Sequence, residues 1–188
     1  MTGRDLSIKH NKLITIASAF LSFFPVFILT FLWDIMKPFN GLLFILLRYL
    51  ILKALVKECG LNIRIGANVK IINWQLLELG SNISIHDNCY LDAFGGIKIM
   101  NDVSIAHSTS LLSSNHTWQN INIPIKYNPV NKGQLIIEDD VWLGCGCRIL
   151  SGIVLKTRTI IAAGSVVTKN TTGNAIYGGV PAKIIKTI

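Results

Sequence analysis

The sequence predicts an all-β fold, a parallel β-solenoid with three sides, and two observations lead to this prediction. The first is an aliphatic residue at every sixth position in the C-terminal part of the chain: Ile137, Leu143, Ile149, Leu155, Ile161 and Val167. An α-helix repeats every 3.6 residues and a half-buried strand every two, so neither keeps this spacing. The second is a mostly smaller residue four positions later: Val141, Cys147, Ile153, Thr159 and Ser165. Three short sides with this spacing form one coil of about 18 residues.

The same spacing continues upstream in three shorter registers. They comprise Ile65 and Ile71; Leu79, Ile85, Leu91 and Ile97; and Ile99, Ile105 and Leu111. Two slips of two residues separate them, one after Ile71 and one from Ile97 to Ile99, and we interpret both as bulges at coil corners. Segments 65–69, 79–83 and 99–103 each set an Asn or Asp between two inward residues, which favours tight turns.

The apolar character of the chain is concentrated in its first sixty residues. Apolar residues make up 51% of the chain and the mean hydropathy is +0.49. Residues 13–33 carry no formal charge and are long enough to cross a bilayer once as a helix, although Pro25 interrupts them. A second apolar run, 41–52, is shorter and contains Arg48, which would cost about 3 kcal/mol at the bilayer centre. We therefore expect an interfacial helix at 41–56.

Basic residues flank the first apolar run on both sides, which bears on its orientation. They are Arg4, Lys9 and Lys12 before it, and Lys37, Arg48, Lys53 and Lys57 after it. A hairpin that enters the membrane and turns near Pro25 keeps both flanks on one face, so we favour a re-entrant anchor over a single span. A cleaved signal peptide is a third alternative. The chain is thus divided into a membrane-associating helical segment, 1–58, and a solenoid domain, 59–188.

Charge and cysteine content narrow the class of protein further. The formal net charge is +8, but the basic residues are dispersed or lie beside the apolar runs, so an anionic membrane surface is a better partner than nucleic acid. Cys59, Cys89, Cys145 and Cys147 match neither a disulfide framework nor a paired zinc motif. Cys89 and Cys147 fall on the repeat and are expected to be small buried side chains.

The repeat is interrupted once, and the interruption is the first indication of a functional site. After Leu111 the next aliphatic member is Ile137, so we expect the intervening residues 112–135 to leave the stack as an extruded loop. Long loops on a regular scaffold are often functional. His116 lies near the start of this loop, in the segment Ser-Ser-Asn-His-Thr-Trp.

Several motifs of the second half resemble the hexapeptide-repeat O-acetyltransferases, the left-handed parallel β-helix group of maltose and galactoside acetyltransferases and of many capsule and O-antigen acetyltransferases. The matching segments are Ser114-Asn115-His116, Val141-Trp142-Leu143-Gly144, Ile161 to Lys169 and Gly178 to Ile185. Weaker similarity extends back to about Leu42. The segment Tyr90 to Ile97 is similar to the polysaccharide-directed branch.

The resemblance implies a left-handed solenoid and acetyl transfer from acetyl-CoA to a sugar hydroxyl, with His116 as general base. An imidazole can take the hydroxyl proton and then return it to the departing thiolate, so no acyl-enzyme is needed. The backbone amides near Gly144 and Cys145 would stabilise the oxyanion. Cys145 as a covalent nucleophile is the less favoured alternative. Asp92 would hold the acceptor or orient His116, or else only cap its own turn.

The resemblance also implies a donor site, which for acetyl-CoA would include Trp142, Gly144, Cys145, Ala163, Thr168, Lys169, Lys183 and Lys186. No metal is expected. A homotrimer follows, since donor groove and loop histidine lie on different faces of one chain. Because acetyl-CoA is cytoplasmic, we expect the solenoid on the cytoplasmic face of the bacterial inner membrane.

Other functions fit the sequence less well. A γ-type carbonic anhydrase would need His86, His107 and His116 to converge on zinc, but their spacing does not fit that family. A non-catalytic scaffold does not account for the intact loop and donor motifs. For the acceptor, a lipid-linked glycan precursor at the membrane is favoured, and a soluble small sugar or amino sugar is the alternative.

Overall fold

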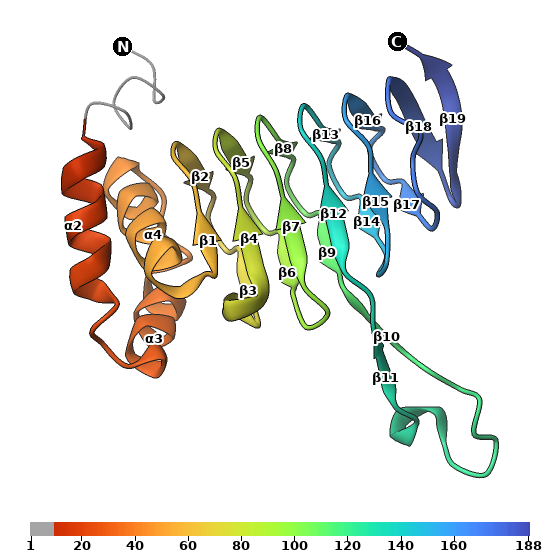
Figure 1. Ribbon diagram of the computed structural model, residues 1–188, viewed down its shortest axis with the longest axis horizontal. Coiled ribbons are helices and arrows are strands. Elements are labelled where there is room, and N and C mark those ends of the chain that lie inside the picture. The colour runs from red at the N-terminus through yellow and green to blue at the C-terminus, as the bar shows by residue number, and fades with distance from the viewer. Residues whose placement is uncertain (1–9) are drawn as a thin grey trace.

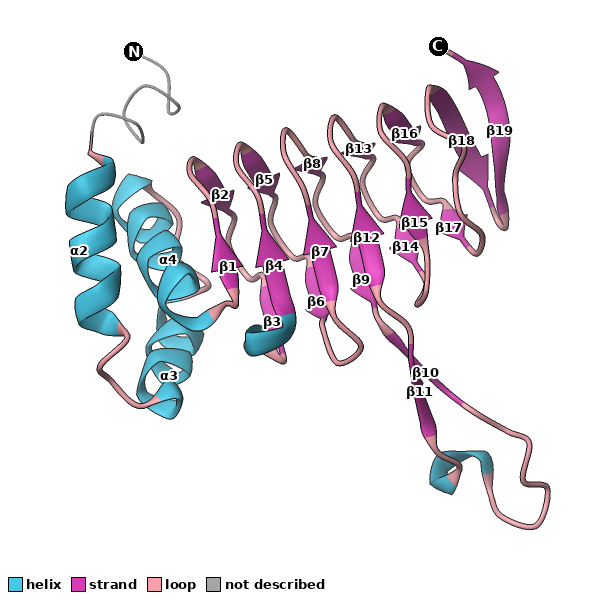
Figure 2. Ribbon diagram, viewed as in Figure 1, coloured by secondary structure: helices cyan, strands magenta, loops and turns pink. Residues whose placement is uncertain are grey.

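The computed structural model describes residues 10–188. Within this range α2 (Asn11–Leu21), α3 (Val26–Met36) and α4 (Leu42–Leu55) come first, and short strands stacked in coils follow (Figure 1). The helices lie at one end of the stack, and the C-terminal strands close the other end (Figure 2). The predicted parallel β-solenoid is therefore confirmed.

The strands form three sheets, one for each side of the solenoid, which we call sides A, B and C. Side A contains β1 (Glu58–Cys59), β4 (Leu77–Leu79), β7 (Ile97–Ile99), β12 (Leu135–Ile137) and β15 (Val154–Leu155). Side B contains β2 (Ile63–Ile65), β5 (Ile83–Ile85), β8 (Ser104–Ile105), β13 (Trp142–Leu143), β16 (Thr159–Ile161), β18 (Ala175–Gly179) and the antiparallel β19 (Ala182–Thr187). Side C contains β3 (Lys70–Ile72), β6 (Tyr90–Asp92), β9 (Ser110–Leu112), β14 (Arg148–Ile149) and β17 (Val166–Val167). The chain visits A, B and C in turn, which creates an A–B, a B–C and a C–A corner.

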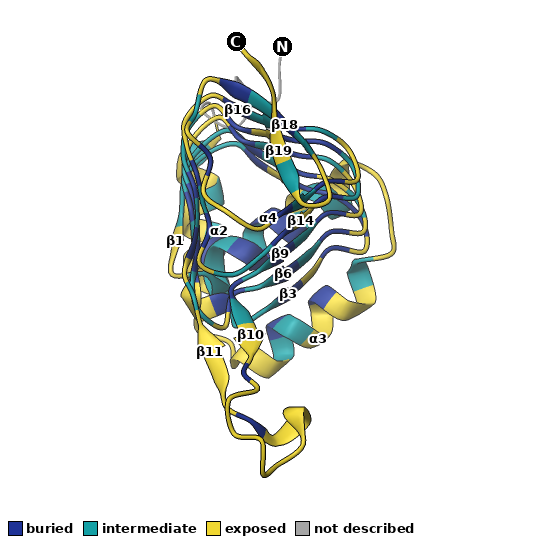
Figure 3. Cartoon of the chain, turned by 90° about the vertical axis from the view of Figure 1, so that its right-hand side faces the viewer, coloured by how far each residue is buried: buried dark blue, intermediate teal, exposed yellow. Residues whose placement is uncertain are grey.

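On each side, small and aliphatic side chains point into the solenoid. In β12, Leu135 and Ile137 are fully buried, while Ile136 between them points outward, because successive side chains of a strand alternate. The six-residue series and the smaller residues that accompany it are the two inward positions of successive sides. Full burial of each aliphatic side chain contributes about 1.5–3 kcal/mol to stability. The buried residues of successive coils contact one another and form one continuous core (Figure 3).

The corners depend on residues that accept a left-handed backbone. Asn68, Asn82 and Asp102, which the sequence placed at turns, have φ of 54°, 59° and 58°. Asn and Asp adopt this conformation more readily than other non-glycine residues, so this prediction is confirmed. The corners are also joined from coil to coil, since the Asn82 side-chain amide donates to Asp102 Oδ1 at 2.8 Å.

The two slips in the six-residue spacing arise from two different turns of the chain. Ile63 pairs with Ile83, whereas Leu143 pairs with Ile161, so the early coils are two residues longer than the late ones. The first slip lies between β3 and β4, where the chain forms the 3₁₀ turn η1 (Trp74–Leu76). The second lies in the turn 93–96, in which the Gly96 amide donates to the Ala93 carbonyl. A slip between Ile97 and Ile99 was the wrong interpretation, because these are the two inward residues of one strand.

The helices α3 and α4 cover the open end of the first coil. Trp33 of α3 is buried, its indole N–H donates to the Val69 carbonyl at 3.0 Å, and its ring meets Trp74 edge-on at 4.8 Å. From α4, Tyr49 and Leu52 are buried, and the Tyr49 hydroxyl donates to the Gly60 carbonyl. The helices therefore share one core with the solenoid across the expected boundary at residue 58.

Arg48 is buried inside the protein, whereas the prediction of an interfacial helix assumed that its charge would have to avoid the bilayer centre. Its side chain is fully buried beneath α4, where Nε donates to the Ile65 carbonyl and Nη1 to the Phe39 carbonyl at 2.8 Å. The guanidinium thus links the end of α3, α4 and the first coil. The charge of Arg48 has an internal structural role, so it gives no reason to place α4 at a membrane surface.

Apolar side chains nevertheless cover the outside of the helical end. Those exposed are Leu13, Ile16, Phe20, Phe23, Phe24, Val26, Phe27, Phe31, Leu32, Ile35, Phe39, Leu42, Leu43 and Leu46. The apolar run 13–33 breaks before Pro25, and the helix direction bends by 119° from α2 to α3. Within residues 10–188 no single helix could cross a membrane by length and composition, but this bent pair passes the same test together. The flanking residues Arg4 and Lys9 lie outside the described residues.

The segment between β9 and β12 leaves the stack as a hairpin. Its strands are β10 (Ser114–His116) and β11 (Val130–Lys132), which pair antiparallel, and the 3₁₀ turn η2 (Ile125–Tyr127) lies near its tip. The hairpin projects away from the solenoid and is exposed over most of its length (Figures 1 and 3). It starts and ends at the C–A corner, so it interrupts the coil without displacing the strands before and after it.

The buried position of Arg48 leads to a stability prediction. Arg48→Met should lower the free energy of unfolding by about 3 kcal/mol, because it leaves buried carbonyl groups without donors. Guanidinium unfolding followed by tryptophan fluorescence measures this change. Lys37→Met is the matched control and should cost less than about 1 kcal/mol, since Lys37 makes a surface ion pair with Asp34. Equal effects of the two substitutions would contradict an internal role for Arg48.

Candidate active site

The candidate site is the base of the hairpin at the C–A corner, where His116 is exposed at the end of β10. In the strand register Ser114 lies opposite Lys132 and His116 opposite Val130. Residues directly opposite on antiparallel strands point to the same face, and neighbours along a strand point to opposite faces. Ser114, His116, Val130 and Lys132 therefore share one face of the hairpin, and Asn115 lies on the other.

Contacts to the solenoid show which way each face is turned. Ser114 Oγ donates to Asp92 Oδ2 at 3.0 Å, and Asp92 ends β6 in the preceding coil. On the other face, the Asn115 side-chain amide donates to Ser151 Oγ at 2.6 Å in the following coil. The face with His116 is thus turned toward the N-terminal coils. Both contacts hold the first residues of the hairpin at a fixed place on the corner.

Asp92 positions the hairpin and its own turn. Its Oδ1 accepts from the Phe94 backbone N–H at 3.0 Å and from the Asn73 side-chain amide at 3.4 Å. The first of these bonds caps the turn that follows Asp92, which was one of the roles the sequence allowed. Asp92 Oδ2 accepts the hydrogen bond from the Ser114 hydroxyl. The structure contains no hydrogen bond between Asp92 and His116, so a direct orienting role for Asp92 is not supported. Instead, Asp92 fixes Ser114, two residues before His116.

Sequence reasoning missed several residues that build this corner. Ser113 is fully buried, donates from Oγ to the Asp92 carbonyl at 2.6 Å, and accepts from the Gly95 backbone N–H. Asn73, Ser114 and Ser151 complete the polar column described above. The available signal was positional: each of these residues follows a strand of side C, where the chain turns toward side A.

The expected donor residues fall into separate groups in one chain. Trp142, of which 53% is exposed, lies on side B, and Gly144, Cys145 and Ala163 follow at the B–C corner. Thr168 and Lys169 come after β17 at the C–A corner, and Lys183 and Lys186 lie on β19. The solenoid does not bring all of these side chains together around His116. A single donor site that used them all would therefore need surfaces from two copies of the chain.

The two backbone amides expected to stabilise an oxyanion differ in whether they are already hydrogen-bonded. The Gly144 N–H donates to the Ile161 carbonyl at 2.8 Å, within the stacking of one coil on the next. It is therefore not available for a ligand, and that expectation was wrong for Gly144. The Cys145 N–H has no backbone partner in the described part of the chain, so it is a free donor at this turn.

The cysteines and histidines limit alternative chemistries. Cys89 and Cys147 are buried, as predicted, and burial raises the pKa of both thiols, that of Cys89 to about 11. Among residues 10–188 no group of three His, Cys, Asp or Glu side chains is placed to hold a metal ion. His86 and His107 are exposed at the B–C corner, whereas His116 belongs to the hairpin at the C–A corner, so the three do not converge.

Comparisons with known proteins agree with this architecture. Residues 135–169 match the family described as bacterial transferase hexapeptide (six repeats). WbbJ of Escherichia coli K12, which is assigned to lipopolysaccharide biosynthesis as an O-acetyl transferase, is 25% identical over 129 residues. That alignment covers 65% of this chain and 66% of WbbJ, slightly less than two thirds of the relative.

Two solved structures share the fold over nearly the whole chain. A hexapeptide-repeat acetyltransferase of Vibrio cholerae O1 biovar eltor, complexed with acetyl coenzyme A, has a TM-score of 0.74 and 20% identity, over 94% of this chain and 87% of that one. A maltose O-acetyltransferase of Clostridium difficile 630 has a TM-score of 0.73 and 21% identity, over 97% and 88%. At this identity the likeness shows the fold. Residues 135–169 carry the hexapeptide repeat of this bacterial transferase family, and the chain shares the three-sided solenoid of both acetyltransferases.

The contacts of Asp92 predict that it orders the hairpin base. Asp92→Ala should accelerate amide hydrogen exchange in residues 113–117 about fivefold, because the loss of one buried side-chain hydrogen bond costs about 1 kcal/mol of local stability. Exchange measured by mass spectrometry tests this. Asp102→Ala, which removes a similar acceptor at the A–B corner, should leave this segment unchanged. The same exchange rate in Asp92→Ala and in the unsubstituted protein would show that Asp92 only caps its own turn.

Proposed function

We propose that the protein transfers an acetyl group from acetyl-CoA to a hydroxyl group of a sugar, with His116 as general base. The observation that carries the proposal is the exposed imidazole at the base of the one hairpin that interrupts the hexapeptide solenoid within residues 58–188. The Vibrio cholerae relative, which shares the fold, binds acetyl coenzyme A. The matching residues at the B–C corner and the C-terminus would hold the donor here.

The reaction proceeds by direct transfer. His116 accepts the proton of the sugar hydroxyl while the hydroxyl oxygen attacks the thioester carbonyl, and the Cys145 N–H donates to the oxyanion that forms. The carbon–sulfur bond then breaks, and the imidazolium returns the proton to the thiolate of coenzyme A. The products are a sugar ester and free coenzyme A, with no covalent enzyme intermediate. Binding both substrates in one complex supplies a large part of the rate.

The separation of the donor residues from His116 supports a site assembled from two chains. His116 and the group of Trp142, Gly144, Cys145 and Ala163 lie at different corners of one solenoid. A neighbouring copy that turns its B–C corner toward the hairpin would complete the site. Three such contacts close a ring, and closed cyclic symmetry is common among homo-oligomers, so we propose a homotrimer.

The exposed apolar face of the helices supports a membrane-associated acceptor. Large contiguous apolar surfaces mark interaction sites, and this one is accompanied by Lys37 and Lys12. We propose that this face docks on the cytoplasmic leaflet of the bacterial inner membrane and that the acceptor is the glycan of a lipid-linked precursor. The hairpin projects from the solenoid on the same side as α3 (Figures 1 and 3), which supports this arrangement.

The role of His116 leads to a kinetic prediction. His116→Ala should lower kcat/KM for acetyl transfer by about 10²–10⁴-fold, the usual contribution of a positioned general base. Release of coenzyme A, detected with a thiol reagent, measures the rate. His10→Ala is the matched control, because His10 is also exposed but lies before α2 at the helical end, and its rate should equal that of the unsubstituted protein. A His116→Ala protein with an undiminished rate would refute the assignment.

The proposed acceptor leads to a second prediction. An undecaprenyl-diphosphate-linked oligosaccharide in anionic vesicles should have a KM at least about tenfold lower than that of the free oligosaccharide, because membrane docking raises the local acceptor concentration. Transfer of radiolabelled acetyl to each acceptor gives the comparison. Replacement of exposed Phe27 and Phe31 by Ser should remove the preference. A lower KM for the free sugar would favour a soluble small-sugar acceptor.

A further inference from the structure

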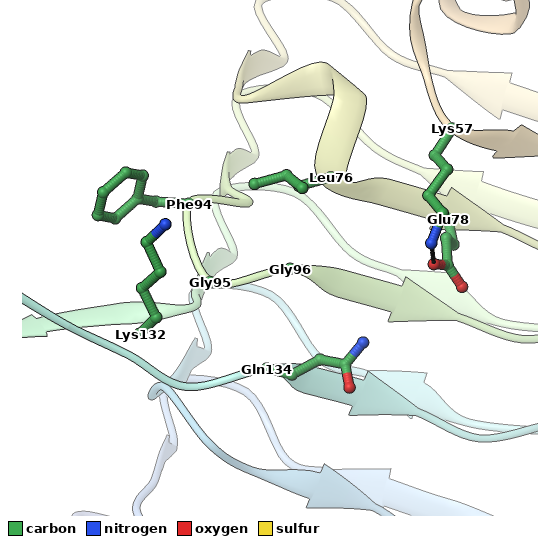
Figure 4. A pocket seen from close by; sticks show the side chains of 8 residues that line it. All are labelled: Lys57, Leu76, Glu78, Phe94, Gly95, Gly96, Lys132 and Gln134. Carbon is green, nitrogen blue, oxygen red and sulfur yellow. Dashed lines mark hydrogen bonds and ion pairs between the residues drawn. The ribbon is translucent and has the colours of Figure 1, made fainter.

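A small pocket adjoins the hairpin base on side A and has no role in the proposed transfer itself. It is lined by Lys57, Leu76, Glu78, Phe94, Gly95, Gly96, Lys132 and Gln134, and its volume is about 250 Å³. Sites for drug-sized ligands usually measure ~300–1,000 Å³, so this pocket is suited to a single sugar residue. Figure 4 shows Lys132 and Phe94 at one end and the Lys57–Glu78 pair at the other, with the two glycines between them.

The pocket lies on the same side of the hairpin as His116. Lys132 is opposite Ser114 in the strand register, and Ser114 and His116 point to the same face because they are two residues apart. One such step along a strand spans about 6.6 Å, which is close to the length of one sugar residue in a glycan. A glycan whose hydroxyl reacts at His116 can therefore extend over Lys132 into the pocket.

The charges in the pocket favour an anion. Lys132 Nζ lies 4.3 Å from the centroid of the Phe94 ring, and this cation–π contact holds the ammonium group at the pocket wall. At the far end, Glu78 is paired with Lys57 at 2.6 Å and with Lys98 at 3.5 Å. These lysines lower the pKa of Glu78, so its carboxylate stays ionised and the charges of Lys57 and Lys98 balance it. Lys132 has no ion-pair partner in the described part of the chain, so its charge is free to attract a ligand.

Glycine gives the pocket its depth. A Cβ atom at Gly95 would meet the Ser113 carbonyl oxygen and the Gly133 amide, so no larger residue fits without displacing the hairpin base. Gly96 has a φ of +92°, which strains any other residue, and a Cβ there would approach the Gln134 side chain at 3.5 Å. The floor between Lys132 and Glu78 is therefore bare backbone, with the Gln134 amide beside it as a hydrogen-bonding group.

We infer that this pocket binds a negatively charged sugar residue of the acceptor, next to the residue that is acetylated. The inference rests on the proposed function and specifies its substrate as an anionic glycan. Lys132 pairs with the anionic group, which is the carboxylate of a uronic acid or a phosphate on the sugar. Gln134 donates to or accepts from ring hydroxyls, and Phe94 fixes Lys132. The pocket thus selects among acceptors, while His116 carries out the reaction.

Binding to the full-length protein tests this inference without depending on acetyl transfer. Isothermal titration with trigalacturonate, its neutral methyl ester and glucose 6-phosphate separates the carboxylate from the phosphate arm. We expect one of the two anions to bind and the neutral ester to bind about twofold to fivefold more weakly, the range for one partly exposed ion pair. Lys132→Met should reduce anion binding to the level of the ester and should not affect the ester itself.

Two further variants make the test specific. Lys70→Met removes the same charge from an exposed position on side C and should leave anion binding unchanged. Phe94→Leu, which keeps an apolar side chain but frees Lys132, should weaken anion binding by a smaller factor. Neither Lys132 nor Phe94 is part of the core, so circular dichroism should show folded protein in each case.

The outcomes separate failure of this inference from failure of the proposed function. Equal binding of the preferred anion to the Lys132→Met and unsubstituted proteins, or no binding of either anion, would overturn the inference. A selective loss of coenzyme A binding in Lys132→Met would also overturn it, because the pocket would then belong to the donor. Absence of acetyl transfer to every sugar tested, with anion binding intact, would instead refute the acetyltransferase.

Discussion

The whole structure depends on the packing of two inward side chains per short side of the solenoid. Residues such as Leu135 and Ile137 are fully buried, and the backbone of each coil is hydrogen-bonded to the next. An inward position accepts only a small or aliphatic residue, since there is little space between the three sides. The length of each side is therefore fixed, and extra residues are displaced to a corner. The corners of this fold are where function can vary without loss of the core.

The C–A corner illustrates this division between core and function. Extra residues there form η1 in one coil, the glycine turn 93–96 in the next, and the long hairpin in the third. Asp92, Ser113 and Ser114 join the hairpin base to the coil beneath it, so His116 is attached to a rigid scaffold although the tip of the hairpin is exposed. The same corner carries the pocket with Lys132. Catalytic and acceptor-binding groups can thus occupy one edge, while the B–C corner keeps the tight coil stacking seen at Gly144.

The sequence alone predicted the solenoid, the turns at Asn68, Asn82 and Asp102, and the buried cysteines, because each depends on a local repeat. It misplaced the second register slip, since Ile97 fits the six-residue spacing equally well as the first inward residue of β7. It also did not reveal that Arg48 is buried or that the Gly144 amide is already bonded. Both facts depend on contacts between residues far apart in the chain. The pocket at Lys132 was missed for the same reason, because its lining comes from four separate segments.

The proposed active site combines His116 of one chain with the donor residues of a neighbouring chain. A crystal structure of the protein with coenzyme A would reveal this arrangement. We expect a trimer in which the thiol sulfur lies within about 4 Å of the His116 imidazole, close enough for proton transfer. The pantetheine arm should contact Trp142 and Ala163 of the adjacent copy. A thiol bound far from His116, or a donor site formed by one chain alone, would refute a site shared between chains.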